Sequence, residues 1–301
     1  MKGRMGEERG ATVVLVALGM VALMGMAALS LDVGELVRVR AHLSDAAIAA
    51  ALSAARELPD NPTAARQVAV AVAHANGAGD PVDVVISSSR SGGPLDRVTV
   101  TLHGHAAFRF APVLGETGAD VAQGATAQAG TVAGLRGAVP LGVEKGTYQY
   151  GQTYTLKSDD PLVPGNFGAL ALGGRGADNY RDNLQHGYAG VLQTGMQVET
   201  EPGNMSGPTQ QGLQPRIDAD PSATCATVQP GSPRLLYVPI VDFAGAHGRS
   251  TVPVVGFAAF FLSSTQKGEV TGCFLRLVTD GDWAPLDPAQ DYGLRSVALI
   301  Q

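Results

Sequence analysis

The feature that most constrains this chain is an uncharged stretch near its start, which runs for 21 residues from Ala11 to Leu31. At about 1.5 Å of rise per residue, a helix of that length measures about 31 Å, close to the thickness of the hydrocarbon core of a bilayer. Basic residues precede the stretch, and this bias favours an N-terminus in the cytoplasm. The sequence therefore predicts a cytoplasmic tail at 1–10, a helix at 11–31 that crosses the lipid bilayer of the cytoplasmic membrane once, and an extracytoplasmic body.

The stretch has two other interpretations. A cleaved signal peptide could use Ala28-Leu29-Ser30 as its small-residue cleavage site, but the apolar part of such peptides usually extends over only about 7–15 residues. A buried helix of a soluble protein would need partners on every face. A retained membrane anchor is the favoured interpretation.

The apolar pattern continues beyond Leu31 in steps of three and four residues, as on one face of a helix. The repeating residues are Leu36, Val39, Leu43, Ala47, Ala50, Ala54 and Leu58. No proline interrupts them before Pro59, so we expect the membrane helix to continue outward to about this point. The alanine stripe either covers a small sheet of the same chain or docks neighbouring helices of an assembly, because small residues allow close approach in both cases.

Four positions stand out around this helix: Gly10 before the uncharged stretch, Asp32 and Gly34 directly after it, and Asp45 ahead of an alanine-rich run. With these positions, residues 8–55 resemble the N-terminal segment of the TadG-like proteins of Tad (tight adherence, Flp) pilus assembly. The resemblance implies a pseudopilin-like accessory component that contacts other Tad/Flp pilus or secretion components. It also implies that a small pilin-like α+β unit is built on the anchor helix.

The sequence departs from the wider pilus pattern in two places. Prepilin peptidase substrates of such systems carry a glycine, a glutamate five residues later and then an aromatic residue, whereas here Gly3 and Glu8 are followed by Arg9. We therefore expect no processing at Gly3. The D-x-S-x-S metal motif of the von Willebrand-type domain that ends some TadG proteins does not occur in the sequence.

The remaining sequence favours strands. In 97–110, Val98, Val100 and Leu102 alternate with polar residues, as in a half-buried strand. Further segments rich in β-branched and aromatic residues follow Pro233, and a polar, glycine-rich middle, including the loop expected at 204–212, separates them from the first part. The predicted fold class is α+β: a single N-terminal transmembrane helix, a pilin-like α+β unit within 32–132, and a β-rich C-terminal domain at 133–301.

Few residue patterns point to chemistry. Neither a G-x-S-x-G nor an H-E-x-x-H motif occurs, so no catalytic residue is assigned and the chain is not expected to be an enzyme. His103 and His105 share a strand face but have no acidic neighbour in sequence, and the glycines of 168–176 favour a turn over a phosphate loop. The carboxylates of the C-terminal loop lack calcium-site spacing; they are Asp280, Asp282, Asp287 and Asp291. No metal ion or cofactor is expected.

Charge and cysteine content exclude further classes. The net charge of −6 makes a sequence-independent interaction with nucleic acid phosphates improbable, so no nucleic acid partner is expected. Cys225 and Cys273 either form one disulfide outside the membrane or serve as two separate small hydrophobic residues. The leading hypothesis is an anchored accessory protein of pilus assembly. The alternative is an anchored, adhesin-like module whose β-rich domain binds an extracellular ligand.

Overall fold

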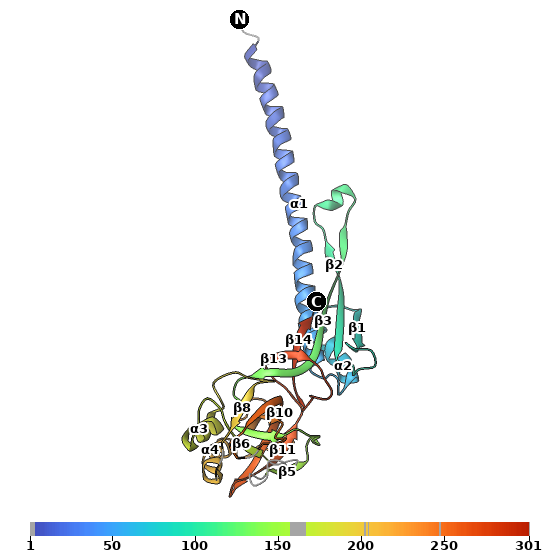
Figure 1. The fold of residues 1–301 in the computed structure, drawn as a ribbon. Coiled ribbons are helices and arrows are strands. Elements are labelled where there is room, and N and C mark those ends of the chain that lie inside the picture. Colours follow the sequence, from blue (N-terminus) through green and yellow to red (C-terminus); the bar gives the residue numbers. More distant parts are fainter. Residues whose placement is uncertain (1–3, 157–166, 202, 204, 247, 301) are drawn as a thin grey trace. The chain divides into compact units, whose positions relative to one another are not determined.

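The computed structural model describes residues 4–156, 167–201, 203, 205–246 and 248–300. Backbone contacts divide the chain into two compact units, each described by itself below. Unit 1 contains Met1–Gln128 with Leu299–Gln301, and unit 2 contains Ala129–Ala298. Figure 1 gives the order and labels of their helices and strands.

Unit 1 is dominated by α1 (Arg4–Ala55), a single helix of 52 residues (Figure 1). The predicted continuation beyond the uncharged stretch is confirmed, with the helix ending a little before Leu58, which is itself fully buried. A second helix, α2 (Pro62–Ala75), begins with proline in its first turn, and the side chain of Asn61 accepts a hydrogen bond from the backbone N–H of Ala64 at 3.0 Å.

Three antiparallel strands complete unit 1: β1 (Val82–Ser87), β2 (Arg97–Ala107) and the first part of β3 (Gly118–Leu135). The predicted apolar face of β2 is fully buried. Both α1 and α2 contact this strand, so the alanine stripe of α1 covers a sheet of its own chain. A short 3₁₀ helix, η1 (Ala111–Leu114), lies in the turn between β2 and β3.

Strand β3 was not anticipated from the sequence, because glycine, alanine, threonine and glutamine are weak or context-dependent strand signals. Its residues 118–128 pair with β2. In unit 2, its residues 130–135 pair with β13 (Asp282–Pro285) and β7 (Leu192–Gln193). The same sheet continues through β14 (Leu294–Ile300), which runs parallel to β12 (Leu277–Val278).

The second sheet belongs to unit 2 and has the order β5-β11-β10-β8-β6-β4-β9. Its strands are β4 (Leu141–Glu144), β5 (Thr153–Leu156), β6 (Phe167–Ala171), β8 (Gln197–Thr200), β9 (Leu235–Val241), β10 (Thr251–Gln266) and β11 (Glu269–Leu275). Because β9 also pairs with β10, five of these strands close into a ring. The β-rich character predicted for the C-terminal half is confirmed.

The polar middle of the chain contains two helices that the sequence analysis did not predict, α3 (Ala177–His186) and α4 (Ser206–Ala219). The expectation of a loop at 204–212 was therefore wrong, since most of it belongs to α4. Proline is tolerated in a first helical turn, and Gly212 permits a close approach, because a Cβ there would lie 2.7 Å from the Cβ of Leu184 in α3. Mutual packing stabilises two helices whose own sequences are polar.

Candidate functional site

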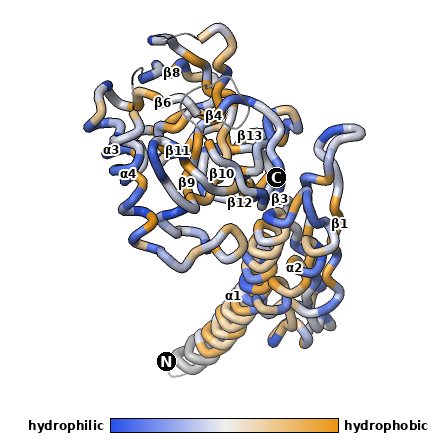
Figure 2. The backbone as a smooth tube through the Cα atoms, turned by 90° about the horizontal axis from the view of Figure 1, so that it is seen from below, coloured by the Kyte–Doolittle hydropathy of each residue, from blue (hydrophilic) through white to orange (hydrophobic). Residues whose placement is uncertain are grey.

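Residues 12–31 of α1 expose apolar side chains on all faces of the helix. Leu15 is 69% exposed, Val21 is 66% exposed and Leu31 is 60% exposed, and Figure 2 shows the apolar colouring of this part of the helix. By length and composition, α1 from Thr12 onward contains a stretch able to span a membrane. A helix that is apolar all round and covered by no protein side chains is suited to lipid.

The C-terminal half of α1 is instead buried by its own unit, through alanine. The buried alanines are Ala46, Ala47, Ala50, Ala51, Ala54 and Ala55. The two elements approach closely where α1 crosses β2, since a Cβ at Gly104 would lie 2.9 Å from Cδ1 of Leu43. Small side chains at this contact let the helix lie directly on the strand.

Asp32 connects the two halves of α1 to the turn between β2 and β3. Its side chain is 4% exposed, and its carboxylate accepts hydrogen bonds from three successive backbone N–H groups: those of Arg109 at 2.7 Å, Phe110 at 3.1 Å and Ala111 at 2.7 Å. Bonds to an ionised acceptor are stronger than neutral ones and satisfy backbone donors at the start of η1. We call this arrangement the Asp32 clasp.

The other positions that carried the family resemblance lie on the surface or in the helix backbone. A Cβ at Gly34 would meet open space, and Asp45 is exposed. Gly10 lies in α1, one residue before Ala11 at the start of the uncharged stretch. Near Gly34, Glu35 and Arg38 form an exposed ion pair at 2.6 Å. Asp32 is thus the one of the four that the structure ties into the fold by hydrogen bonds.

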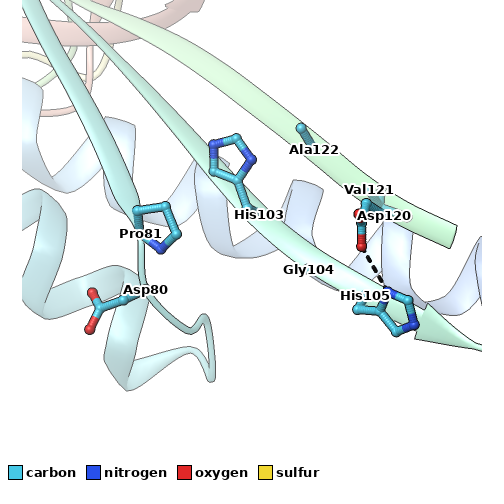
Figure 3. A pocket seen from close by; sticks show the side chains of 8 residues that line it. All are labelled: Asp80, Pro81, His103, Gly104, His105, Asp120, Val121 and Ala122. Carbon is cyan, nitrogen blue, oxygen red and sulfur yellow. Dashed lines mark hydrogen bonds and ion pairs between the residues drawn. The ribbon is translucent and has the colours of Figure 1, made fainter.

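His103 and His105 lie on one face of β2, as predicted, and Figure 3 shows them lining a shallow pocket. The acidic neighbours that the sequence did not reveal come from adjacent strands. Nε2 of His103 lies 2.9 Å from Asp83, and Nδ1 of His105 lies 2.7 Å from Asp120. These are separate exposed pairs, and among the described residues no group of three or more potential metal ligands occurs.

The acidic residues of the C-terminal loop are also dispersed. Asp282 lies in β13, Asp280 is exposed, and the Asp287 carboxylate accepts a hydrogen bond from the N–H of Ala289. Asp291 forms an ion pair with Arg295 at 2.7 Å. The carboxylates of Asp287 and Asp291 therefore serve a turn and an ion pair.

Cys225 and Cys273 are joined by a disulfide in unit 2, with their Cα atoms 6.3 Å apart. Cys273 lies in β11 opposite Phe261 of β10 and is fully buried. The bridge links the segment after α4 to β11 of the second sheet and closes a loop with a sequence separation of 48. Closing a loop of that size restricts the unfolded chain by about 4 kcal/mol in the chain-entropy account.

A pocket lined by tyrosines in unit 2 was missed by the sequence analysis. Tyr150 and Tyr292 line it together with Gln149, Arg276 and Asp291. The guanidinium carbon of Arg276 lies 4.6 Å from the centroid of the Tyr150 ring. Burial raises the pKa of both the Tyr150 and the Tyr292 hydroxyls, so both rings are neutral over the physiological range. The concentration of tyrosine in 148–154 was the only sequence signal for this pocket.

Comparison with known proteins identifies the anchor segment alone. Residues 10–57 match the family described as putative Flp pilus-assembly TadE/G-like. No curated protein and no solved structure matches the chain. The matched segment covers the uncharged stretch, the clasp residue Asp32 and the buried alanine stripe, which are the features that the structure joins in one helix. Through this segment, the chain is similar to the putative Flp pilus-assembly TadE/G-like family.

Proposed function

We propose that the chain is a membrane-anchored accessory component of Flp pilus assembly that acts through protein contacts, in a pseudopilin-like manner. In this proposal residues 11–31 cross the cytoplasmic membrane, the N-terminus faces the cytoplasm, and residues 32–301 lie outside the membrane. The observation that carries the proposal is the family match at 10–57, which coincides with a helix whose residues 12–31 are almost all exposed and whose residues 46–55 pack through a buried alanine stripe. No catalytic step is part of the proposal.

The exposed faces of α1 support partner binding near the membrane surface. Gly34 leaves the helix backbone open on one side, and Val37 beside it is 57% exposed. Small residues and exposed apolar side chains on a helix that leaves the membrane suit the approach of another helix. We assign other Tad/Flp pilus or secretion components as the partners of this surface.

Deletion of the gene in the source bacterium tests the proposal directly. Loss or shortening of Flp pili, restored by the intact gene, is the expected result in electron micrographs of the cells. Unchanged filament number, length and retention would overturn it. External protease on spheroplasts tests the topology separately, because it should remove the C-terminal units and spare a short fragment protected by the membrane.

A second candidate function is ligand binding by unit 2, as in an anchored, adhesin-like module. The tyrosine-lined pocket favours it, since aromatic rings beside amide and carboxylate groups suit the stacking and hydrogen bonding of a carbohydrate. Binding of the purified protein to a glycan array, abolished by Tyr292→Ala, would support this function. A Tyr292→Ala variant that restores pili in the deletion strain would show that the two functions are separate.

A further inference from the structure

The turn between β2 and β3 places apolar side chains on the surface of unit 1. We call residues 108–115 the hairpin tip. Val113 in the tip is 89% exposed, the highest value for a large hydrophobic residue in the described part of the chain, and Phe110 is 44% exposed. Pro112 between them is also exposed. Apolar side chains gathered at the end of a projecting turn favour a non-aqueous environment.

The Asp32 clasp fixes the position of the tip along α1. Asp32 is the first residue after the uncharged stretch, and the Cα–Cβ bond of a helical residue tilts toward the helix N-terminus, which here is the membrane side. The Asp32 carboxylate accepts hydrogen bonds from the backbone N–H groups of 109–111. The tip therefore lies beside the outer end of the uncharged stretch. Figure 1 shows the turn lying alongside α1.

The exposure of the stretch itself supports this placement. Among residues 12–31, whose side chains the structure describes, all are exposed except Ala28, which is partly shielded. Ala28 lies one helical turn before Asp32 on the same face, and η1 contacts α1. The tip therefore reaches back past Asp32 to the last turn of the stretch that is suited to lipid.

The charges around the tip fit the boundary between headgroups and acyl chains. Arg109 is exposed at the start of the tip and Glu116 is exposed just after it, so both can remain in the headgroup layer. An arginine beside aromatic and aliphatic side chains is typical of segments that lie in the membrane interface. The apolar residues would enter the outer part of the hydrocarbon region while these charges stay hydrated.

We propose that the hairpin tip is a second, non-spanning membrane contact, in which Phe110, Pro112 and Val113 insert into the phospholipid leaflet next to α1. The inference rests on the membrane anchoring in the proposed function and adds a role for unit 1. A single helix leaves the attached unit free to rotate and tilt, whereas a second contact held by the Asp32 clasp restrains both motions. Unit 1 is then presented to its partners in one orientation.

Depth-dependent fluorescence quenching tests this contact in the full chain. Because Cys225 and Cys273 are paired, a thiol introduced by Val113→Cys can be labelled with an environment-sensitive fluorophore in protein reconstituted into liposomes of phosphatidylcholine and phosphatidylglycerol. Val85→Cys provides the matched control, because Val85 is an exposed valine, at 59%, in β1 of the same unit. We expect blue-shifted emission and strong quenching by spin-labelled lipids at position 113, and neither effect at position 85.

The clasp supplies a second variant. Asp32→Asn in the Val113→Cys background should reduce lipid quenching at position 113, since the amide of asparagine is a weaker acceptor for the three N–H groups. Unchanged quenching in this variant would remove the role of the clasp in holding the tip.

The outcomes separate the inference from the anchor on which it rests. Protein that floats with the liposomes but shows the same water-like emission at positions 113 and 85 overturns the membrane contact and leaves the anchor intact. Protein that does not float with the liposomes overturns the anchoring in the proposed function. Emission at 113 that shifts only when other pilus proteins are added, without quenching by lipid, would assign the tip to a protein partner and also overturn the inference.

Discussion

Both halves of α1 are helical and carry apolar side chains, yet the apolar side chains of the two halves differ in size. Residues 12–31 carry many valines, leucines and methionines and are exposed, whereas the buried stripe of 46–55 consists of alanine. Lipid accepts bulky side chains on every face of a helix, but a sheet that packs on a helix needs short ones on one face. Side-chain size therefore distinguishes the part of an apolar helix that faces lipid from the part that faces protein.

The largest expected difference between the two halves is in the apparent free energy of membrane insertion after a charge is introduced. Val21 and Val37 are both exposed valines of α1, but only Val21 lies within the uncharged stretch. Val21→Arg should raise the apparent free energy of membrane insertion by about 3 kcal/mol, while Val37→Arg should change it little. A translocon insertion assay on segment 8–40 measures both. Equal effects would show that the lipid boundary does not lie near Leu31.

Enlarging an alanine should affect the stability of the fold in only one of the two halves. Ala50 is fully buried, so Ala50→Leu should destabilise unit 1 by about 1–3 kcal/mol through overpacking. Ala17 is exposed within the stretch, and Ala17→Leu should leave the fold unchanged. Thermal unfolding of the full chain in nanodiscs measures the difference. A similar midpoint for both variants would contradict the assignment of the alanine stripe as a tight protein contact.

The boundary between the halves is marked by Asp32, and its removal should have a smaller, local effect. Asp32→Asn weakens three charge-assisted hydrogen bonds and should cost about 1.5 kcal/mol. Asp45→Asn changes an exposed carboxylate of the same helix and serves as the control. Hydrogen exchange should accelerate at the amides of 109–111 in the first variant alone; protection that survives there would argue against the clasp.

The anchor helix could be predicted from the sequence because its signals are local. An uncharged stretch, a three-and-four repeat and an alternating strand at Val98, Val100 and Leu102 need no knowledge of distant residues. The strand-rich second half followed from the same kind of signal. Asp32 was identified through the resemblance. Its hydrogen-bond partners at 109–111 could not be predicted, because no local sequence pattern indicates which residues so far apart in the chain come together.

The elements that were missed depend on tertiary contacts. Helix α4 contains Gly207, Gly212 and Pro215, and it persists because Gly212 lets it pack closely against α3. Strand β3 has little intrinsic strand preference, and it is held by its pairing with β2 on one stretch and with β13 on another. The carboxylates beside His103 and His105 also come from other strands, so sequence neighbours could not reveal them.

A buried carboxylate in unit 2 extends the comparison beyond α1. Glu144 in β4 is 9% exposed and accepts a hydrogen bond from the backbone N–H of Phe243 at 2.9 Å. Burial raises the pKa of the Glu144 carboxyl, and the neighbouring Asp242 adds to this effect, against the opposing hydrogen bonds. Asp32 instead accepts hydrogen bonds from three backbone N–H groups. The two carboxylates therefore differ in how fully backbone hydrogen bonds offset the free-energy cost of desolvation.

Glu144→Gln should therefore stabilise the protein slightly at neutral pH, because glutamine keeps an oxygen for the Phe243 N–H and carries no charge to desolvate. A carboxyl with a raised folded-state pKa binds its proton more readily in the folded chain, so the stability of the parent falls as pH rises from the ordinary glutamate pKa through the raised value. The variant lacks this fall. Asp242, whose pKa is lowered by its hydrogen bond to Lys145, contributes an opposite dependence at lower pH that both proteins share. Unfolding midpoints measured between pH 4 and pH 8 should converge at the acid end and separate toward neutrality; parallel curves would mean that the hydrogen bonds to Glu144 fully offset the burial of its carboxylate.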